Sequence, residues 1–344
     1  MFIITGGAGM IGSALLWQLN NQGVTDILVV DNLASTEKWK NLVKAQYLGY
    51  MHRDEFLDCV REDRLEEALE LEHGIPRLHG NELGKLQGIV HLGACSATTE
   101  RDADYLMRNN LEYSKVLCDY ALRRGARFIQ ASSAATYGDG SQGFDDDVDR
   151  LGELHPLNMY GYSKHLFDLW AVRTGRMRSI ASIKFFNVYG PNEYHKGDMR
   201  SMVQKSVEQI QATGKVRLFK SYKPEYTDGG QVRDFIYVKD CARVLAVLLQ
   251  NPGMNGLFNL GTGKARSWND LANAVFSALG REPKIEYVEM PEILRGKYQY
   301  HTEAKMQRLG DAFWSVEKDL DLRSLEDGVK DYVQNYLTQD DPYL

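Results

Sequence analysis

The stretch that decides the fold is Phe2-Ile3-Ile4-Thr5-Gly6-Gly7-Ala8-Gly9-Met10-Ile11-Gly12. A short apolar run, typical of a buried strand, leads directly into glycines spaced as G-x-x-G-x-x-G, and a helical pattern follows. Glycine allows a tight turn and lets the backbone approach a pyrophosphate, while the helix N-terminus offers free N–H groups to phosphates. Asp31 follows about 20 residues later, where an acidic residue accepts hydrogen bonds from an adenosine ribose. The sequence therefore predicts a dinucleotide site.

Strand-like and helical segments alternate through the first half of the chain. Further short apolar runs, bounded by polar or turn residues, occur at 27–30, 89–92, 128–131 and 180–186. Helical spacing is clearest at 13–21, 112–123 and 163–173. Such alternation indicates a parallel sheet covered on both faces, and right-handed crossovers make it doubly wound. We predict an α/β fold, a Rossmann-type doubly wound parallel sheet with a smaller α/β C-terminal substrate domain.

The residue pattern changes after Gly190-Pro191: the predicted loops become longer and contain aromatic and basic residues. Strand-like runs recur later, at 235–238 and 257–260. Because these runs can return to the first domain, we expect the two domains to be interleaved in sequence rather than divided at one point. The predicted dinucleotide-binding domain comprises residues 1–185 with returning segments near 229–263. The predicted substrate-binding domain comprises residues 186–228 and 264–344.

The segment 61–86 is charged and rich in glutamate, with helical spacing at Leu65, Leu69 and Leu71. We predict a surface insertion of one helix and a loop.

Composition excludes several classes of protein. The 344 residues carry a formal net charge of −6 and are 43% apolar, which suits a chain with a sizeable core and gives no support for nucleic-acid binding. The four cysteines form no Cys-x-x-Cys pair, so neither a disulfide nor a metal site is expected, and a reducing cytoplasm is favoured. No apolar run approaches a membrane span, and the first residues resemble a strand and turn rather than a signal peptide. We expect a cytoplasmic protein without a membrane or nucleic-acid partner.

Tyr160-Gly161-Tyr162-Ser163-Lys164 places a tyrosine and a lysine about one helical turn apart on the same face. The ammonium then favours the phenolate and brings the phenol towards useful base strength. Tyr-x-x-x-Lys alone is common by chance on surface helices. Here it follows the glycine pattern and a serine-rich strand end that includes Ser133. The three together predict hydride chemistry.

These residues resemble the extended short-chain dehydrogenase/reductases, enzymes that modify nucleotide sugars. Within that family the chain is similar to the ADP-L-glycero-D-manno-heptose 6-epimerases over nearly its whole length. The segments that carry the wider resemblance are the glycine pattern, Ala131-Ser132-Ser133-Ala134-Ala135-Thr136-Tyr137-Gly138, Tyr160 to Lys164 and Arg233-Asp234-Phe235-Ile236-Tyr237-Val238. The segments that carry the narrower one are Ile27-Leu28-Val29-Val30-Asp31-Asn32-Leu33, Gly93-Ala94-Cys95-Ser96-Ala97-Thr98-Thr99-Glu100, Phe185-Phe186-Asn187-Val188-Tyr189-Gly190-Pro191 and His195-Lys196-Gly197.

The resemblance implies a redox epimerase. Such an enzyme oxidises C6″ of ADP-D-glycero-D-manno-heptose to a ketone and returns the hydride to the opposite face, and the product feeds synthesis of the lipopolysaccharide core. Because the cofactor ring is fixed, the ketone must turn, and its oxygen then occupies two positions. One acid/base cannot lie within about 3 Å of both. Two such groups are therefore needed.

The resemblance assigns those roles residue by residue. Tyr160 is one acid/base, and Lys164 lowers its pKa and holds the nicotinamide ribose. Ser133 hydrogen-bonds the reacting hydroxyl. Lys196 is the second acid/base, although a lysine in a polar loop is ordinarily solvated. It needs a lowered pKa, from burial or from nearby cations.

The remaining site residues also follow from the resemblance. The cofactor contacts are Gly6, Gly9, Met10, Ile11, Gly12, Asp31, Asn32, Lys38, Arg53, Leu92, Gly93, Ala94, Cys95, Ser96, Asn109, Tyr160, Lys164 and Val188. The substrate contacts are Ser133, Asn187, Lys196, Asp198, Lys205, Phe219, Lys220, Ser221, Tyr222, Arg233 and Tyr298. Two of these carry alternatives: Asp198 either pairs with Lys196 or contacts the sugar, and Arg233 either binds the ADP phosphates or pairs with an acid such as Asp234.

The identity of the cofactor stays open between NADP and NAD. Asp31 disfavours a 2′-phosphate, whereas Lys38 and Arg53 are cations that can pair with one. The resemblance implies tightly held NADP. It also implies a homo-oligomer, such as a pentamer.

Three competing functions differ in their sequence requirements. A nucleotide-sugar 4,6-dehydratase needs an acid pair where this chain has Ala134-Ala135. A UDP-hexose 4-epimerase is the main alternative, although Lys196 and Thr98-Thr99-Glu100 favour the heptose. A non-catalytic NADP-binding regulator typically lacks the tyrosine or the lysine, and both are present here.

Overall fold

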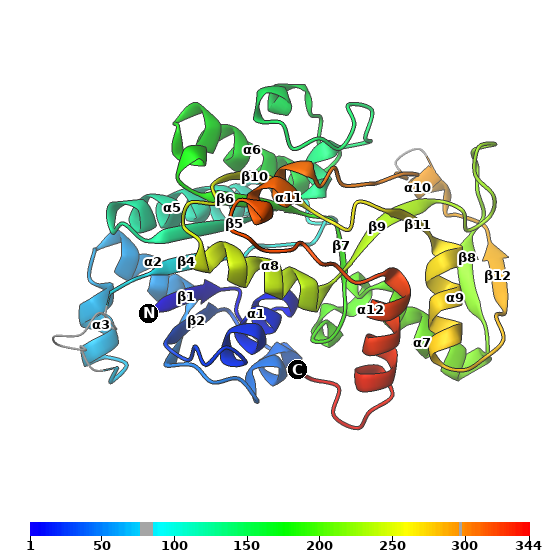
Figure 1. Ribbon diagram of the computed structural model, residues 1–344, viewed down its shortest axis with the longest axis horizontal. Coiled ribbons are helices and arrows are strands. Elements are labelled where there is room, and N and C mark those ends of the chain that lie inside the picture. The colour runs from blue at the N-terminus through cyan, green and yellow to red at the C-terminus, as the bar shows by residue number, and fades with distance from the viewer. Residues whose placement is uncertain (76–84, 296–297) are drawn as a thin grey trace.

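The structure, a computed structural model, describes residues 1–75, 85–295 and 298–344 and is built around a seven-stranded sheet (Figure 1). All neighbouring strands in it are parallel. Their spatial order is β10 (Gly256–Leu260), β6 (Ala181–Phe185), β5 (Arg127–Ser133), β4 (Gly88–His91), β1 (Phe2–Thr5), β2 (Ile27–Asp31) and β3 (Gly49–His52). The chain runs outward from β1 to β3 and then resumes at β4 on the other side. The order therefore reverses beside β1, which is where doubly wound sheets bind ligands.

Helices cover both faces of this sheet, as the alternating strand side chains require. Ile3 packs with one helical layer and Ile4 with the other. The first layer contains α2 (Arg53–Arg61), α3 (Leu65–Leu71), α5 (Tyr113–Arg123) and α6 (Met159–Arg173). The second contains α1 (Met10–Asn20), α8 (Val238–Gln250) and α11 (Gln307–Trp314). The Rossmann-type fold predicted from the sequence is confirmed.

A smaller α/β unit lies at the right of Figure 1. One of its sheets contains β11 (Ala265–Ser267), β9 (Val232–Tyr237) and β7 (Asn187–Tyr189), and the other pairs β12 (Ile285–Val288) with β8 (Val216–Phe219). Its core is formed with α7 (Met202–Thr213), α9 (Trp268–Ala278) and α12 (Leu325–Tyr332). The strand-like run at 257–260 joins the large sheet as β10, whereas the run at 235–238 belongs to β9 in the small sheet.

Short helical turns complete the chain. They are η1 (Glu37–Leu42), α4 (Ala103–Leu106), the π-helical η3 (Met107–Glu112), η4 (Ala134–Tyr137), η5 (Val148–Glu153), η6 (Arg176–Arg178), η7 (Tyr194–Met199), α10 (Glu292–Arg295) and the π-helical η8 (Val333–Leu337). In the described ranges, every helix is too short or too polar to span a bilayer.

The segment 61–86 contains the helix α3, as its spacing predicts. One face of α3 buries Leu65 and Leu69 in the core, while Leu71 is exposed. That the segment is an insertion stays a prediction. Residues 76–84 of this segment lie outside the described residues.

Candidate active site

A cavity of about 620 Å³ opens at the carboxyl ends of β1, β2, β4 and β5. Every residue that the sequence assigned to the cofactor lines it. These residues are Gly6, Gly9, Met10, Ile11, Gly12, Asp31, Asn32, Lys38, Arg53, Leu92, Gly93, Ala94, Cys95, Ser96, Asn109, Tyr160, Lys164 and Val188. The two other predicted catalytic residues, Ser133 and Lys196, line the same cavity. The topology thus gathers side chains from 6 to 196 at one sheet edge.

The glycine turn has the shape that a pyrophosphate needs. A Cβ atom on Gly6, whose φ is 68°, would lie 2.7 Å from the backbone nitrogen of Gly93, and one on Gly12 would lie 2.2 Å from the Gly6 carbonyl oxygen. Gly9 precedes α1, whose N-terminus carries no side-chain cap and no acidic residue in its first turn. Its first N–H groups and positive dipole end are therefore free to meet an anion.

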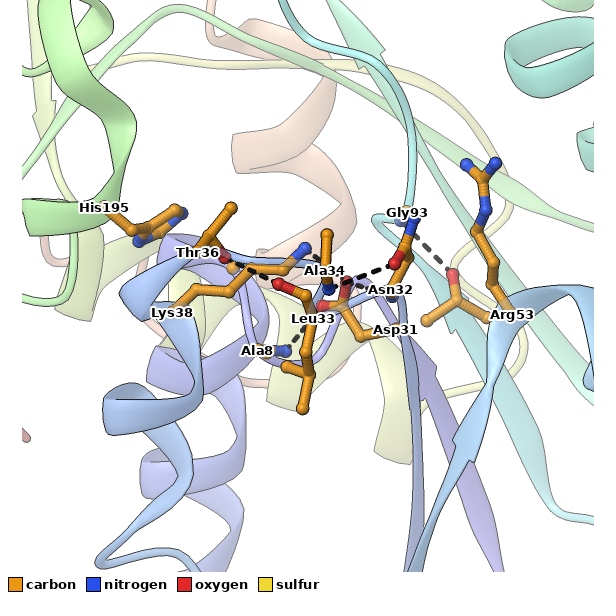
Figure 2. Close-up of polar contacts among 12 residues, drawn as sticks. Ala8, Asp31, Asn32, Leu33, Ala34, Thr36, Lys38, Arg53, Gly93 and His195 are labelled. Atoms are coloured by element: carbon orange, nitrogen blue, oxygen red, sulfur yellow. Dashed lines mark hydrogen bonds and ion pairs between the residues drawn. The ribbon is translucent and has the colours of Figure 1, made fainter.

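Asp31 closes the cavity at the end of β2 and is already heavily engaged. Its Oδ2 accepts from the Ala8 amide at 2.8 Å, and its Oδ1 accepts from the Asn32 amide and the Lys38 ammonium, both at 2.7 Å. Figure 2 shows Lys38 and His195 on one side of this carboxylate and Arg53 on the other. The Lys38 cation is thus held at the cavity rim by Asp31.

Arg53 and the paired asparagines of η3 shape the opposite wall. The Arg53 Nη1 donates to Asn109 Oδ1 at 2.5 Å. The buried Asn110 accepts from the Cys95 amide at 2.9 Å and donates to the Cys95 carbonyl at 3.0 Å. It also donates to the Ser163 hydroxyl at 3.1 Å. One side chain therefore ties the 92–96 wall of the cavity to the helix that carries Tyr160.

Tyr160 reaches Ser133 because α6 approaches η4, the turn directly after β5, very closely. A Cβ atom on Gly161 would lie 2.7 Å from the Ala135 carbonyl oxygen, so only glycine fits there. Burial raises the pKa of Tyr160, and its hydrogen bond with Ser133 offsets part of that rise. Ser133 Oγ also accepts from the Ala135 amide at 3.1 Å. Ser133 therefore fixes both the strand end and the phenol.

Lys164 lies fully inside the protein, beneath the cavity. Its ammonium donates to the Ala131 carbonyl at 2.7 Å, and burial lowers its pKa to about 8, against the opposing charge of Asp168. Lys164 is not among the groups that shift the pKa of Tyr160, which burial raises and the Ser133 hydrogen bond lowers. The predicted effect of Lys164 on the Tyr160 phenol stays a prediction.

Lys196 occupies the other wall, on η7. Its ammonium lies 3.7 Å from Met10 Sδ, and burial lowers its pKa, with the carboxylate of Glu193 opposing that shift. Among the described residues, no carboxylate forms an ion pair with it. Asp198 is exposed, and its backbone carbonyl accepts from Lys205 at 2.6 Å. The suggestion that Asp198 pairs with Lys196 is therefore wrong, and Glu193 is the acid that acts on it.

Arg233 lies outside this cavity, in the small domain on β9. Its guanidinium is buried between the rings of Trp268 and Tyr298, at 5.7 and 5.2 Å from their centroids. Asp234 is engaged elsewhere, because it accepts from the amides of Thr262 and Ala304 at 2.6 and 3.0 Å. In the part of the chain that the structure describes, Arg233 has no carboxylate partner. The ion-pair alternative with Asp234 is therefore excluded.

The other predicted substrate residues are dispersed over the small domain. Phe219 packs edge-on against Tyr298 at 6.4 Å, and the Lys220 ammonium pairs with Glu289 at 2.7 Å. Tyr222 also bonds Glu289. Asn187 is exposed at the start of β7, Ser221 follows β8, and Lys205 lies on α7. Of the predicted substrate residues, only Ser133 and Lys196 line the cavity.

Comparison with known proteins identifies this arrangement. The model of the NAD dependent epimerase/dehydratase family matches residues 2–261. The chain belongs to this family. The ADP-L-glycero-D-manno-heptose-6-epimerase of Nitratidesulfovibrio vulgaris (strain DP4) is 60% identical to it over 344 residues, 100% of each chain. The crystal structure of the Helicobacter pylori ADP-L-glycero-D-manno-heptose-6-epimerase is 27% identical, with a TM-score of 0.75, covering 97% of this chain and 95% of that one. The predicted resemblance is confirmed.

A more distant epimerase shares the fold. The Thermus thermophilus UDP-glucose 4-epimerase, solved in complex with NAD, is 22% identical, with a TM-score of 0.69 over 96% of this chain and 97% of that one. The described ranges of the present epimerase contain no group of three or more His, Cys, Asp or Glu side chains that could hold a metal ion.

Several cavity residues of this epimerase were missed by the motif reading. They are Thr5, Val30, Thr36, His91, Ala97, Tyr105, Tyr113, Ala131, Ser132, Phe185, Phe186, His195 and Met199. Most carry no chemical signature; they lie at or near strand ends, in the following loops, or, as for Tyr105 and Tyr113, on helices α4 and α5. His195 was visible within His-Lys-Gly. Burial and the Lys196 and Lys38 charges lower its pKa to about 4, so it is neutral at pH 7.

Proposed function

We propose that this enzyme inverts C6″ of ADP-D-glycero-D-manno-heptose, giving ADP-L-glycero-D-manno-heptose for the lipopolysaccharide core. The observation that carries the proposal is the pairing of Tyr160 and Lys196. They come from α6 and η7, and both line the cavity that contains the glycine turn. A single oxidation needs one acid/base, whereas inversion through a ketone needs two on different sides.

The glycine turn and the uncapped N-terminus of α1 fit a nicotinamide dinucleotide, which would supply the hydride acceptor and donor for C6″. In one half-reaction Tyr160 takes the hydroxyl proton while Ser133 hydrogen-bonds the same oxygen. Lys164 lies below and provides positive charge for the phenolate. After the ketone turns, Lys196 protonates its oxygen from the other side. The reverse reaction starts with neutral Lys196, for which a pKa lowered by burial is favourable.

We propose NADP as the preferred cofactor. Both Asp31 oxygens already accept from protein donors, which leaves less acceptor capacity for a ribose hydroxyl. The Lys38 ammonium sits at the same rim and is a natural partner for a 2′-phosphate. Arg53 is a second cation on the cavity wall.

We propose Arg233 as the ligand of the substrate diphosphate. A buried guanidinium without a carboxylate partner is costly unless an anion joins it, and its fork suits phosphate oxygens. Phe219, Lys220, Ser221, Tyr222 and Tyr298 surround the same part of the small domain and complete the proposed nucleotide-sugar contacts, with Asn187, Asp198 and Lys205 nearer to η7. A homo-oligomer, such as a pentamer, rests on the resemblance and is tested by sedimentation. A cytoplasmic location rests on the unpaired spacing of the four cysteines.

Purified enzyme incubated with ADP-D-glycero-D-manno-heptose tests the proposal. We expect the C6″ epimer to appear in the NMR spectrum, and we expect Lys196→Met to remove turnover while the bound cofactor is retained. Inversion of UDP-galactose without action on the heptose would instead establish the 4-epimerase alternative.

A further inference from the structure

Residues 342–344 lie against the loop that carries Lys196. The Leu344 amide donates to Asn192 Oδ1 at 3.1 Å, and the Tyr194 hydroxyl donates to the Pro342 carbonyl at 2.7 Å. The rings of Tyr194 and Tyr343 meet edge-on, with centroids 5.2 Å apart. Asn192 and Tyr194 precede Lys196 by four and two positions. In Figure 1 this part of the chain, at the end marked C, lies beside α1.

The same short segment also contacts the chain just after η1. Lys44, just after η1, donates to the Tyr343 carbonyl at 2.8 Å and pairs with Asp341 at 2.8 Å. The η1 turn carries Lys38, which borders the cavity. Residues 341–344 therefore connect the region after η1 with the loop that carries Lys196.

Beneath this segment, the start of the loop is tied to the glycine turn. Asn192 is fully buried with φ of 69°, a conformation that a non-glycine residue keeps only where its surroundings hold it. Its Nδ2 donates to Ser13 on α1 at 2.9 Å, and its carbonyl accepts from Asn41 at 3.0 Å. Asn41 also donates to the Ala8 carbonyl at 2.8 Å. The segment covers the outer side of this junction.

A second anchor holds the loop from below. Glu193 is fully buried and accepts from the Ser201 amide at 2.5 Å, the Ser201 hydroxyl at 2.6 Å and the Tyr332 hydroxyl at 3.1 Å. Tyr332 also shares a hydrogen bond with the Tyr194 side chain. Loss of residues 342–344 therefore leaves the loop attached through Glu193 and Tyr332, but removes the contacts of Tyr194 with Pro342 and Tyr343.

We propose that residues 342–344 position the Lys196 loop, and that Tyr194 is the positioning residue through which they act. The inference rests on the proposed function, in which Lys196 serves as the second acid/base. Removing this cover lets η7 shift, and a displacement of about 1 Å at a reacting group costs about 10²-fold in rate. The Tyr160 side of the site lies on other elements, and it stays intact.

The test uses the holoenzyme lacking residues 342–344 and, separately, Tyr194→Phe, which loses only the hydroxyl. Formation of reduced nicotinamide is followed in single turnovers with each of the two C6″ epimers. One epimer is oxidised through Tyr160 and the other through Lys196. We expect the deletion to slow oxidation of the epimer that reacts through Lys196 about 10²-fold, and oxidation of the epimer that reacts through Tyr160 no more than about twofold. Tyr194→Phe loses the hydrogen bonds to Pro342 and Tyr332 and should slow oxidation of the Lys196-dependent epimer by about fivefold or more.

Equal slowing of both epimers, or no slowing, would overturn the inference, because a merely structural role has no epimer preference. If the deletion variant fails to fold, the asymmetry in Tyr194→Phe decides the matter. Lys196→Met separates the two proposals. If Lys196→Met slows only one epimer but the deletion slows both equally, the positioning role is rejected and the second-base function stands. If Lys196→Met slows neither epimer, the second-base function is rejected, and this inference is rejected with it. Gln339→Ala is the matched control, since this exposed side chain bonds only to Gln334.

Discussion

The two halves of the site are built differently. In the cofactor half, every residue assigned from the sequence lines one cavity at a sheet edge. In the substrate half, most of the assigned residues lie outside that cavity, on β8, β9 and the following loops of the small domain. The difference follows from topology. Parallel strands bring their carboxyl ends to one edge whatever the loops do, whereas the substrate contacts depend on how two domains face each other.

The largest expected effect comes from Tyr160, which stands where the two halves meet. Tyr160→Phe removes the proton-transfer group but none of the phosphate cradle. Turnover should fall about 10³-fold, within the range for a general acid/base, while the cofactor stays bound. Epimer formation and the absorbance of bound cofactor measure the two effects. Tyr162→Phe is the control, because the Tyr162 side chain is exposed. An unchanged turnover rate in Tyr160→Phe would contradict the mechanism.

A smaller effect is expected from Arg233, which belongs to the substrate half alone. Arg233→Met should lower kcat/KM about 10²-fold, mainly through KM, because charge-assisted hydrogen bonds contribute about 1.5–3 kcal/mol each. Cofactor affinity should not change. Steady-state kinetics and cofactor titration measure both, with Arg217→Met on the exposed face of β8 as the control. If Arg233→Met instead lost cofactor while the KM for substrate stayed unchanged, Arg233 would not belong to the substrate half of the site.

A still smaller effect is expected from Lys38, which belongs to the cofactor half alone. Lys38→Met leaves Asp31 with its two backbone donors but removes the cation. The preference for NADP over NAD should fall about tenfold, as the loss of one charge-assisted contact implies. Titration of both cofactors measures this, and Lys40→Met, which removes an exposed partner of Glu37, is the control. An equal loss of affinity for both cofactors would contradict a 2′-phosphate role.

The smallest effect concerns stability rather than turnover. His91 is buried at the end of β4, bonded to Thr5 and Ser114 at 2.6 and 3.0 Å, and burial lowers its pKa to about 3. In the unfolded chain a histidine binds its proton near about pH 6.5, so unfolding takes up a proton below that pH. The contribution of His91 to stability is therefore fully present above that value and falls by about 1.4 kcal/mol per pH unit as the pH drops towards 3.

Denaturant unfolding at several pH values tests this dependence. His91→Gln keeps polar contacts but cannot titrate, so its stability should change less between about pH 7 and pH 5. An identical pH dependence in both proteins would show that His91 does not control it.

Sequence reasoning succeeded where the determinants are local. The residues of the β1–glycine–α1 unit lie within one short stretch, and so do Tyr160 and Lys164. The sequence pattern alone therefore indicates these parts of the site. It failed for β3, because Gly49–His52 is a four-residue strand without an apolar run. It also failed for Gly161, whose necessity depends on a carbonyl 26 positions earlier in the chain, at Ala135.

Electrostatic tuning was equally hard to foresee. One of the two alternatives for Asp198, the nearer residue in sequence, was an ion pair with Lys196. Asp198 is exposed, whereas Glu193 is buried by a fold that also brings Ser201 and Tyr332 onto it. The tie between Asn110 and Cys95 likewise depends on the π-helical turn at η3. Such contacts depend on tertiary structure, and no spacing rule predicts them.

The central claim is that C6″ is inverted by a hydride that leaves and returns within one active site. The most direct test supplies ADP-D-glycero-D-manno-heptose with deuterium at C6″, in ordinary water. The account predicts an inverted C6″ that keeps its deuterium, because the hydride never exchanges with solvent. Inversion with loss of deuterium to water, or no inversion at all, would contradict it.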